Sequence, residues 1–413
     1  MGQALQVEFA IVNEWDVQTW MGAIALILLS IQAPATALLM ARLLRGPGRI
    51  QPLKPAEATP DQKGAVSIVI PTLNEAERIA PCLAGVTRQG YEVREIIVVD
   101  SQSTDGTVEQ VKAAQASDPR FRLIYDDPLP QDWVGRPWAL HNGFLHSSPE
   151  SEWILGIDAD TVPRPGLVAS LVALAQQQQY DVVSLSPQFI LKTAGEFWLQ
   201  PALLMTLVYR FGPSGSASES AERVMANGQC FLIRRSLLEE LGGYTIAKDS
   251  FCDDVTLARQ AAAQGAIVQF LDGAKVLQVR MYEGLQDTWD GWGRSLDLKD
   301  ASSVGQKWGD LALLAAVQGA PVILTPLLTA LVLLSPSVPL FLTAALGLNG
   351  GLLLIRFALL FAIRPSYAMD LAQGADWSFW LSPLADPLAV YRIFLSSTRR
   401  PTQWRSRDYS NRL

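Results

Sequence analysis

The sequence predicts an α/β fold in which helices flank a mostly parallel mixed sheet, with transmembrane helices in the N- and C-terminal parts. Short apolar runs alternate with helical patterns through the middle of the chain. Carboxylates directly follow several of these runs. Two long stretches without a charged side chain lie toward the two ends. Together these observations predict a globular domain held between membrane segments.

The strands are expected where short apolar runs end at polar residues or at proline. These runs are 66–71, 95–100, 121–125, 153–157 and 181–186, and helical patterns cover 105–116, 137–146 and 164–177. In open α/β sheets, ligands bind beyond the carboxyl ends of the strands. The acidic residues at such ends are Glu75, Asp100, Asp158 and Asp160. Four acids at this edge are hard to explain as solvated surface.

Asp158 and Asp160 follow a buried strand and are separated by one alanine. Residues two apart in extended backbone point the same way, so both carboxylates are expected to face one spot. A hard divalent cation, Mg²⁺ or Mn²⁺, would offset their repulsion and could be shared with substrate phosphates. The alternative is a solvated turn in which one of them caps a helix that begins near Pro163.

The apolar stretches are long enough to cross a bilayer. Residues 17–41 carry no charge, and Pro34 lies inside this segment. The charge-free run 311–355 is too long for one span and is interrupted by prolines at 335–339. We therefore expect two further spans, at 311–334 and 339–363. Arg356 would face protein or reach toward an interface.

Basic residues beside the spans predict the orientation. They are Arg42, Arg45, Arg49 and Lys54 after the first span, Arg364 after the third, and Arg399, Arg400, Arg405, Arg407 and Arg412 in the tail. All are expected in the cytoplasm, so the protein should be a multi-pass membrane protein with its middle region in the cytoplasm. Segment 377–395 has basic flanks on both sides and is expected to be interfacial or re-entrant rather than a fourth span.

The resulting organisation has five parts. They are an N-terminal region with one span (1–45), a linker (46–64), a cytoplasmic α/β domain (65–308), two spans (309–363), and an interfacial segment with a basic tail (364–413). The net charge of −7 gives no support for nucleic-acid binding. Three widely spaced cysteines and two histidines argue against a zinc site, a disulfide framework or a histidine-based triad.

Several motifs, in this order and spacing, resemble family 2 glycosyltransferases with the GT-A nucleotide-sugar fold. They are Ile70-Pro-Thr-Leu-Asn-Glu75, Val98-Val-Asp-Ser-Gln-Ser-Thr-Asp-Gly-Thr107 and Asp158-Ala-Asp160. Segment 135–143 is similar to a further family motif, with Arg136 in place of the usual lysine. Segments 228–235, 242–244 and Cys252-Asp-Asp254 are similar to its later blocks. The resemblance covers about 65–275.

The resemblance implies a nucleotide-diphosphate sugar as donor and a divalent metal as cofactor. Asp160 would hold the metal, and Asp158 would be shared between metal and ribose. Glu75 and Asp100 lie where the family holds the base and ribose. Arg136 would place a fixed positive charge on phosphate, and Arg280 is expected to reach the diphosphate.

The acceptor hydroxyl needs a general base near neutral pH. Asp254 matches the family's base and is preferred to Asp253 as the catalytic base. Both residues begin a helical run, whose N-terminus would stabilise a carboxylate. Simple helix capping is the structural alternative for both residues. A single displacement assisted by one base would invert the anomeric configuration.

The acceptor is expected to be a membrane lipid, because apolar segments adjoin the catalytic domain. The Gln-x-x-Arg-Trp motif of processive polysaccharide synthases is absent near Gln278. The pattern from Arg280-Met-Tyr282 to Gly291-Trp292 instead resembles bacterial glycosyltransferases that decorate carotenoids or related isoprenoid lipids. A hydroxylated carotenoid is therefore the leading acceptor. Alternative acceptors are a hopanoid, a sphingolipid and a polyprenyl phosphate. Alternative functions of the protein are a polysaccharide synthase and a non-catalytic lipid-binding scaffold.

Overall fold

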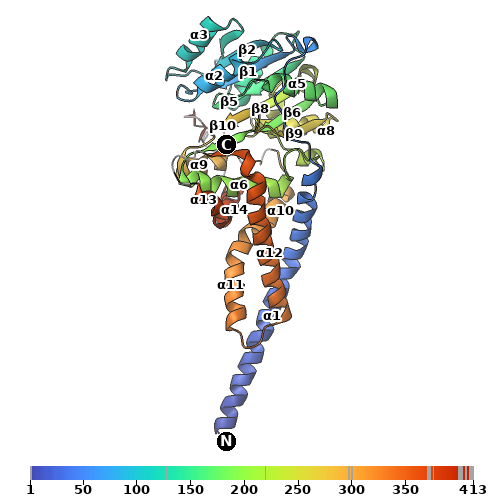
Figure 1. The fold of residues 1–413 in the computed structure, drawn as a ribbon, viewed down its shortest axis with the longest axis vertical. Helices are drawn as coiled ribbons and strands as arrows, with labels where there is room; N and C mark the ends of the chain where they lie inside the picture. The colour runs from blue at the N-terminus through green and yellow to red at the C-terminus, as the bar shows by residue number, and fades with distance from the viewer. Residues whose placement is uncertain are drawn as a thin grey trace.

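A computed structural model shows a fold in three tiers (Figure 1). They are an α/β domain, a layer of short helices beneath it and three long helices. The structure describes residues 2–126, 128–218, 220–295, 298, 301–369, 374, 376–398, 403–404 and 407–408, and it describes no side chains for 2–17, 293–295, 403–404 and 407–408. The predicted basic tail thus lies largely outside the described residues.

The α/β domain is built on a seven-stranded sheet. Its strands are β1 (Val66–Thr72), β2 (Val93–Asp100), β3 (Phe121–Tyr125), β4 (Trp153–Ile157), β6 (Val182–Ser186), β8 (Cys230–Arg234) and β9 (Val268–Asp272). Their order is β3-β2-β1-β4-β8-β6-β9. The first four are parallel, β8 runs antiparallel between β4 and β6, and β6 pairs in parallel with β9. The predicted mixed, mostly parallel sheet is confirmed, although the sequence analysis did not identify β8 or β9.

Both faces of this sheet are covered by helices. These are α2 (Ile79–Thr87), α3 (Thr107–Ser117), α4 (Gly135–Leu145), α5 (Leu167–Gln178), α7 (Arg235–Glu240) and α8 (Asp253–Ala263). Along β1, Ile68 and Ile70 enter one buried cluster while Val69 enters the other. Alternate side chains of a strand point to opposite faces, so a strand buried on both sides reads as a continuous apolar run.

A smaller sheet and several short helices connect this domain to the long helices. The strands are β5 (Thr161–Pro163), β7 (Gln188–Leu191), β10 (Leu277–Val279) and β11 (Tyr367–Met369), in the order β11-β7-β10-β5. The helices are α6 (Ala194–Phe211), α9 (Gly284–Ser295), α13 (Trp377–Trp380) and α14 (Asp386–Thr398), and a separate strand pair is β12 (Gln403–Trp404) with β13 (Arg407–Asp408). Short 3₁₀ turns are η1 (Gly46–Gly48), η2 (Pro60–Gln62), η3 (Ala221–Arg223), η4 (Thr245–Ala247), η6 (Arg364–Ser366) and η8 (Ser382–Ala385).

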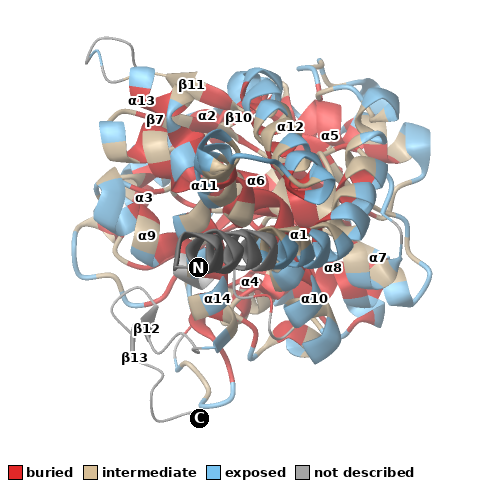
Figure 2. Cartoon of the chain, turned by 90° about the horizontal axis from the view of Figure 1, so that it is seen from below, coloured by how far each residue is buried: buried red, intermediate tan, exposed pale blue. Residues whose placement is uncertain are grey.

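Three helical segments are long and apolar enough to cross a membrane: Gln18–Gly48, Val304–Leu334 and Leu340–Ser366. They correspond to α1 (Gly2–Leu43), to α10 (Val304–Leu314) joined through the π-helical turn Ala315–Gly319 to α11 (Ala320–Leu334), and to α12 (Leu340–Ile363). Their outward surfaces are exposed when the molecule is viewed from below (Figure 2). Leu333, Leu334 and Leu354 are 78%, 81% and 72% exposed, as expected of side chains that meet lipid.

One buried polar contact joins the long helices to α14, and a second joins two of the long helices to each other. Arg356 of α12 binds the carboxylate of Asp386 of α14 with nitrogen–oxygen distances of 2.7 and 3.1 Å, and Gln318 donates to the same carboxylate. Gln32 of α1 and Asn349 of α12 exchange amide hydrogen bonds of 3.0 and 2.9 Å. Arg356 therefore faces protein, which is one of the two positions that the sequence analysis left open.

Breaking the buried ion pair from one side should destabilise the fold. Arg356 and Asp386 are 2% and 0% exposed, so Arg356→Met leaves an uncompensated carboxylate and should lower the free energy of unfolding by about 3–5 kcal/mol. Arg356→Met combined with Asp386→Leu should recover much of this loss because no buried charge remains. Thermal unfolding in detergent micelles measures both. A double variant that is less stable than either single variant would contradict this account.

Candidate active site

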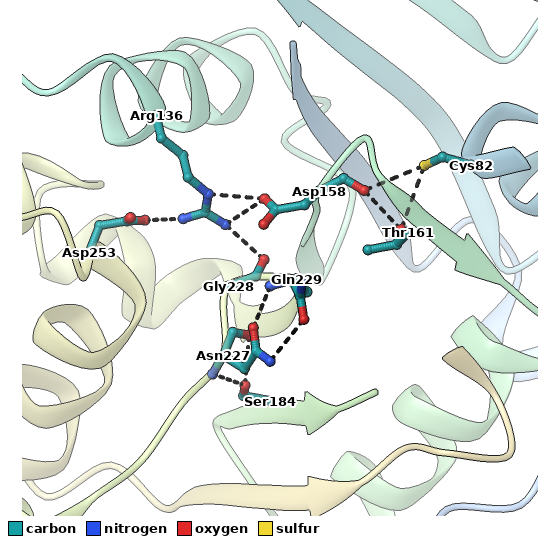
Figure 3. Close-up of polar contacts among 9 residues, drawn as sticks. All are labelled: Cys82, Arg136, Asp158, Thr161, Ser184, Asn227, Gly228, Gln229 and Asp253. Atoms are coloured by element: carbon teal, nitrogen blue, oxygen red, sulfur yellow. Dashed lines mark hydrogen bonds and ion pairs between the residues drawn. The ribbon is translucent and has the colours of Figure 1, made fainter. Parts of the chain in front are cut away.

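The two predicted carboxylates leave the end of β4 as the sequence analysis expected. Ala159 between them is buried, and the turn is closed by Thr161, whose hydroxyl donates to the Asp158 carbonyl at 2.8 Å (Figure 3). Asp158 and Asp160 are both half-buried and line one cavity. The turn that follows β4, rather than an extended backbone, thus brings both carboxylates to the same cavity.

Arg136 is the counter-charge of this site. It lies in the first turn of α4 and contacts Asp158 at 3.0 Å from Nε and 2.9 Å from Nη2. Its Nη1 donates to Asp253 at the start of α8, and its Nη2 donates to the Gly228 carbonyl at 2.7 Å (Figure 3). Burial opposes its charge, but Asp158 and Asp253 together raise the pKa of Arg136 well above its ordinary value. One guanidinium thus joins three segments that are distant in sequence.

The loop that supplies the Gly228 carbonyl is held by a local network. Ser184 of β6 accepts from the Asn227 amide at 2.7 Å and donates to the Asn227 carbonyl at 2.9 Å. The Asn227 side chain also bonds Gln229 in both directions, through its amide and its carbonyl oxygen (Figure 3). The sequence analysis singled out the segment from Gly228 onward but assigned no role to Asn227, which positions it.

These residues surround a cavity of about 810 Å³. Six of the predicted site residues line it: Glu75, Arg136, Asp158, Asp160, Asp253 and Asp254. They come from the end of β1, the first turn of α4, the turn after β4 and the first turn of α8. The topology therefore gathers in one place residues that span about 180 positions of sequence.

Asp100 and Arg280 are predicted site residues that do not line this cavity. Asp100 is 2% exposed, and its carboxylate accepts from the Ser103 amide at 3.0 Å and from the Thr72 hydroxyl at 3.2 Å. Arg280 is paired with Glu196 at 3.1 Å and with Glu283 at 3.2 Å. These contacts fix local structure, so their positions do not support the nucleotide roles predicted for both residues, which stay predictions.

Three carboxyl groups of the cavity have raised pKa values. Burial is the largest cause for Glu75, Asp160 and Asp254, and in each case the pKa rises to about 7. Neighbouring carboxylates add to the effect: Asp158 acts on Glu75 and Asp160, and Asp253 acts on Asp254. The cavity therefore holds more negative charge than its own arginines neutralise.

This charge balance fits a divalent cation that is only partly held by protein. Asp158 and Asp160 offer hard carboxylate oxygens, and one oxygen of Asp158 already faces Arg136. Within the described residues, no group of three or more His, Cys, Asp or Glu side chains is arranged to hold a metal alone. Mg²⁺ and similar ions commonly complete such sites with water and substrate phosphates. The donor set thus suits a metal that arrives with a diphosphate.

Asp253 and Asp254 differ in what their carboxylates can do. Asp253 is 3% exposed and bound to Arg136. Asp254, at the next position of α8, is half-buried and lines the cavity. An acid that is committed to an ion pair is a poor proton acceptor, so this geometry favours Asp254 over Asp253 as a base.

The sequence analysis missed an apolar wall of the cavity. It is formed by Leu43 at the end of α1, by Leu204, Leu207 and Val208 of α6, and by Leu359 and Ile363 of α12. The wall unites residues from both ends of the chain, and no local pattern indicates this. The cavity therefore runs from a charged end at the sheet to an apolar end at the long helices.

Comparisons with known proteins agree with this geometry. Residues 67–242 match the model of the glycosyl transferase family 2. A 4,4'-diaponeurosporenoate glycosyltransferase of Staphylococcus haemolyticus is 24% identical over 240 residues, which are 58% of this chain and 63% of the relative. The Staphylococcus aureus (strain USA300) protein of the same name is 27% identical over 237 residues, 56% of this chain and 60% of the relative. The chain thus matches about three fifths of the length of these relatives.

A solved structure has a similar fold. The mannosyltransferase from Pyrobaculum calidifontis, in complex with GDP-Man and Mn²⁺, aligns with a TM-score of 0.52 and 20% identity over 92% of this chain and 98% of its own. This similarity confirms the GT-A fold class, and the family match confirms the expected glycosyltransferase domain.

The position of Arg136 should depend on the absence of a side chain at residue 228. A Cβ at Gly228 would lie 2.4 Å from Arg136 Nη2, and the guanidinium cannot move without loosening its carboxylate contacts. Gly228→Ala should therefore lower the free energy of unfolding by about 1–3 kcal/mol. Gly305→Ala is the control, because nothing lies within 4 Å of its Cβ position. Equal thermal unfolding of the two variants would contradict this role of Arg136.

Proposed function

From the glycosyltransferase family 2 domain formed by residues 67–242, we propose that the protein transfers a sugar from a nucleotide-diphosphate sugar to an acceptor that stays in the membrane. The observation that carries this proposal is the cavity itself. Its charged end holds Asp158, Asp160 and Arg136, and its apolar end is built from residues of α1, α6 and α12. A polar donor and a lipid acceptor can meet in one such space.

The donor would bind at the charged end. Asp160 and Asp158 would hold a divalent cation, Mg²⁺ or Mn²⁺, which when bound neutralises the leaving diphosphate. Arg136 adds a fixed positive charge next to Asp158. Glu75, which is buried and paired with Arg78 at 3.0 Å, lies on the same wall and is suited to bind a nucleoside hydroxyl or base. The presence of Mn²⁺ and GDP-Man in the Pyrobaculum enzyme is compatible with this assignment.

The transfer needs one base. The acceptor oxygen forms a bond to the anomeric carbon as the bond from that carbon to the diphosphate oxygen breaks, and Asp254 takes the acceptor's proton. The nucleoside diphosphate leaves on the opposite side, so the anomeric configuration inverts. Asp253 holds Arg136 and thereby places α8, and with it Asp254, at the cavity.

The acceptor proposed first is a hydroxylated carotenoid. The apolar wall suits a long hydrocarbon chain, and the relatives are named after diaponeurosporenoate. That name denotes a carboxylate, so a carotenoid acid that forms a glycosyl ester is the second candidate. A carboxylate is already deprotonated near neutral pH and would need no base.

The proposed topology places the catalytic domain in the cytoplasm, where nucleotide sugars are made. The three long apolar helices anchor it, and Arg42, Arg45 and Arg49 follow the first of them. Basic residues beside a span favour the cytoplasmic side. The segment after α12 forms short helices that pack on α6, as expected of an interfacial element rather than a fourth span.

Lipid mass spectrometry on the host with and without the gene tests the function and the base together. Deletion should remove one glycolipid and accumulate its aglycone, and only the wild-type gene should restore it. Asp254→Asn should lower the rate with a hydroxyl acceptor by about 10²–10⁴-fold, and a chelator should lower the wild-type rate. Full complementation by Asp254→Asn would indicate either that the acceptor is a carotenoid acid or that Asp254 is not the base. An altered surface polymer with unchanged lipids would favour a polysaccharide synthase.

The rate should also rise with pH through about 7. Burial and then the Asp253 carboxylate raise the pKa of Asp254 to about 7, Arg136 lowers it, and Asp158 adds a smaller upward contribution. A base acts in its deprotonated form, so kcat/KM at saturating metal should fall about tenfold per pH unit below this value and level off above it. The residual activity of Asp254→Asn should lack this dependence. An unchanged profile in the variant would assign the ionisation to another group.

A further inference from the structure

A cluster of five arginines lies where the end of α1, the end of α6, η3 and α8 meet. We call Arg42, Arg45, Arg210, Arg223 and Arg259 the arginine cluster. Three of its guanidinium groups lie over the ring of Phe211, at 5.1, 6.0 and 5.8 Å from its centroid. These residues are distinct from Arg136, Asp158 and Asp160 at the charged end of the catalytic cavity, and the proposed transfer chemistry uses none of them.

The cluster has more positive than negative charge. Arg223 pairs with Asp310 at 2.8 Å. The other acidic residues of this part of the chain are Glu222 and Glu219, and Glu219 lies outside the described residues. Asp310 and Glu222 thus offset part of the positive charge that the five arginines bring together. Burial, with Arg259 and Arg223 acting in the same direction, lowers the pKa of Arg210 to about 10.

Two members of the cluster are buried with donors that protein does not satisfy. Arg210 is 5% exposed, and its Nε donates to the Thr206 carbonyl at 3.1 Å. Arg259 is 6% exposed, and its Nε donates to the Val224 carbonyl at 3.0 Å. Among the described residues, the Nη2 atoms of both find no hydrogen-bond acceptor. A buried charged donor without an acceptor is costly, so an acceptor from outside the chain is expected.

Four of the arginines line a small pocket of about 10 Å³, which holds about one water molecule or one oxygen of a larger group. The pocket is lined by Arg42, Arg45, Arg210, Arg223, Ser216 and Ser218, together with Phe211, Gly212 and Ala217. The hydroxyl oxygen of Ser216 is buried and has no partner within the part of the chain that the structure describes. Arginine forks and a hydroxyl are the donors that recognise a phosphate group.

We propose that this pocket binds a phosphate group, with the headgroup of an anionic phospholipid as its source. Arg42 and Arg45 end the first membrane helix, where a headgroup lies. Basic residues beside a span attract anionic lipids. One phosphate oxygen enters the pocket between Arg210 and Ser216, and the remainder lies in the adjoining space. Free phosphate carries the same chemistry and is the alternative source.

The pocket adjoins the catalytic cavity, because Phe211, Gly212, Ser216, Ser218 and Arg223 line both. A bound phosphate would therefore order the wall that separates the two spaces. This site goes beyond the proposed glycosyl transfer, and it can be tested by binding alone.

Native mass spectrometry of the purified full-length protein tests the site, with phosphatidylglycerol and phosphatidylcholine titrated in parallel. Wild type should retain one tightly bound phosphatidylglycerol. Ser216→Ala removes a hydroxyl donor and Arg45→Gln removes a guanidinium group, and each should weaken the binding of phosphatidylglycerol about tenfold. Arg210→Gln removes the buried donor. Ser216→Ala changes only a hydroxyl, so it keeps the test valid if Arg210→Gln fails to fold. Arg364→Gln is the matched control, since Arg364 is exposed at the end of another membrane helix.

Inorganic phosphate added at millimolar concentration distinguishes the sources. If it raises the melting temperature of wild type but not of Ser216→Ala, and no lipid selectivity is seen, the site takes free phosphate. If neither phosphatidylglycerol nor phosphate binds better to wild type than to the variants, the proposal is wrong. It is also wrong if Arg364→Gln weakens lipid binding as much as Arg45→Gln, because general surface charge would then explain the effect.

Discussion

The ion pairs of Arg136 are the constraint on which the catalytic end depends. Its guanidinium lies between Asp158 and Asp253 and also reaches the Gly228 carbonyl. Without it, two carboxylates from different elements would repel each other across the cavity. The same contacts fix the start of α8, which decides where Asp254 lies. A single positive charge therefore positions both Asp158 and the start of α8, which are the proposed donor and base sides of the site.

The features that the sequence predicted are those that follow from local chain geometry. Asp158 and Asp160 directly follow the end of β4, and their meeting with Glu75 follows from the shared edge of parallel strands. The positions of the three long apolar helices follow from uncharged runs, and the buried position of Arg356 follows from the cost of a charge in apolar surroundings. In each case a rule about the backbone or the solvent was sufficient.

Tertiary contacts account for features that the local sequence pattern does not indicate. Asp100 also ends a strand, but the amide of Ser103 and the hydroxyl of Thr72 occupy its carboxylate. Arg280 follows a motif resemblance, yet Glu196 and Glu283 bind it. The apolar wall and the arginine cluster join α1 to α6 and to segments after residue 200, and sequence spacing carries no information about such contacts. Local chemistry thus identified candidate groups and packing determined their contacts, while the nucleotide roles of Asp100 and Arg280 stay predictions.

The π-helical turn at 315–319 has a consequence for how the membrane helices are oriented. Within this turn the amide of Ala320 bonds the carbonyl of Ala315, five residues earlier, and the carbonyl of Ala316 accepts from Gln32 of α1 at 2.9 Å. One extra residue in an α-helix rotates everything beyond it by about 100°. α10, before the turn, contacts α6 and α14, whereas α11, after it, contacts α12. The rotation at this turn therefore lets one continuous helical segment pack against two different sets of helices.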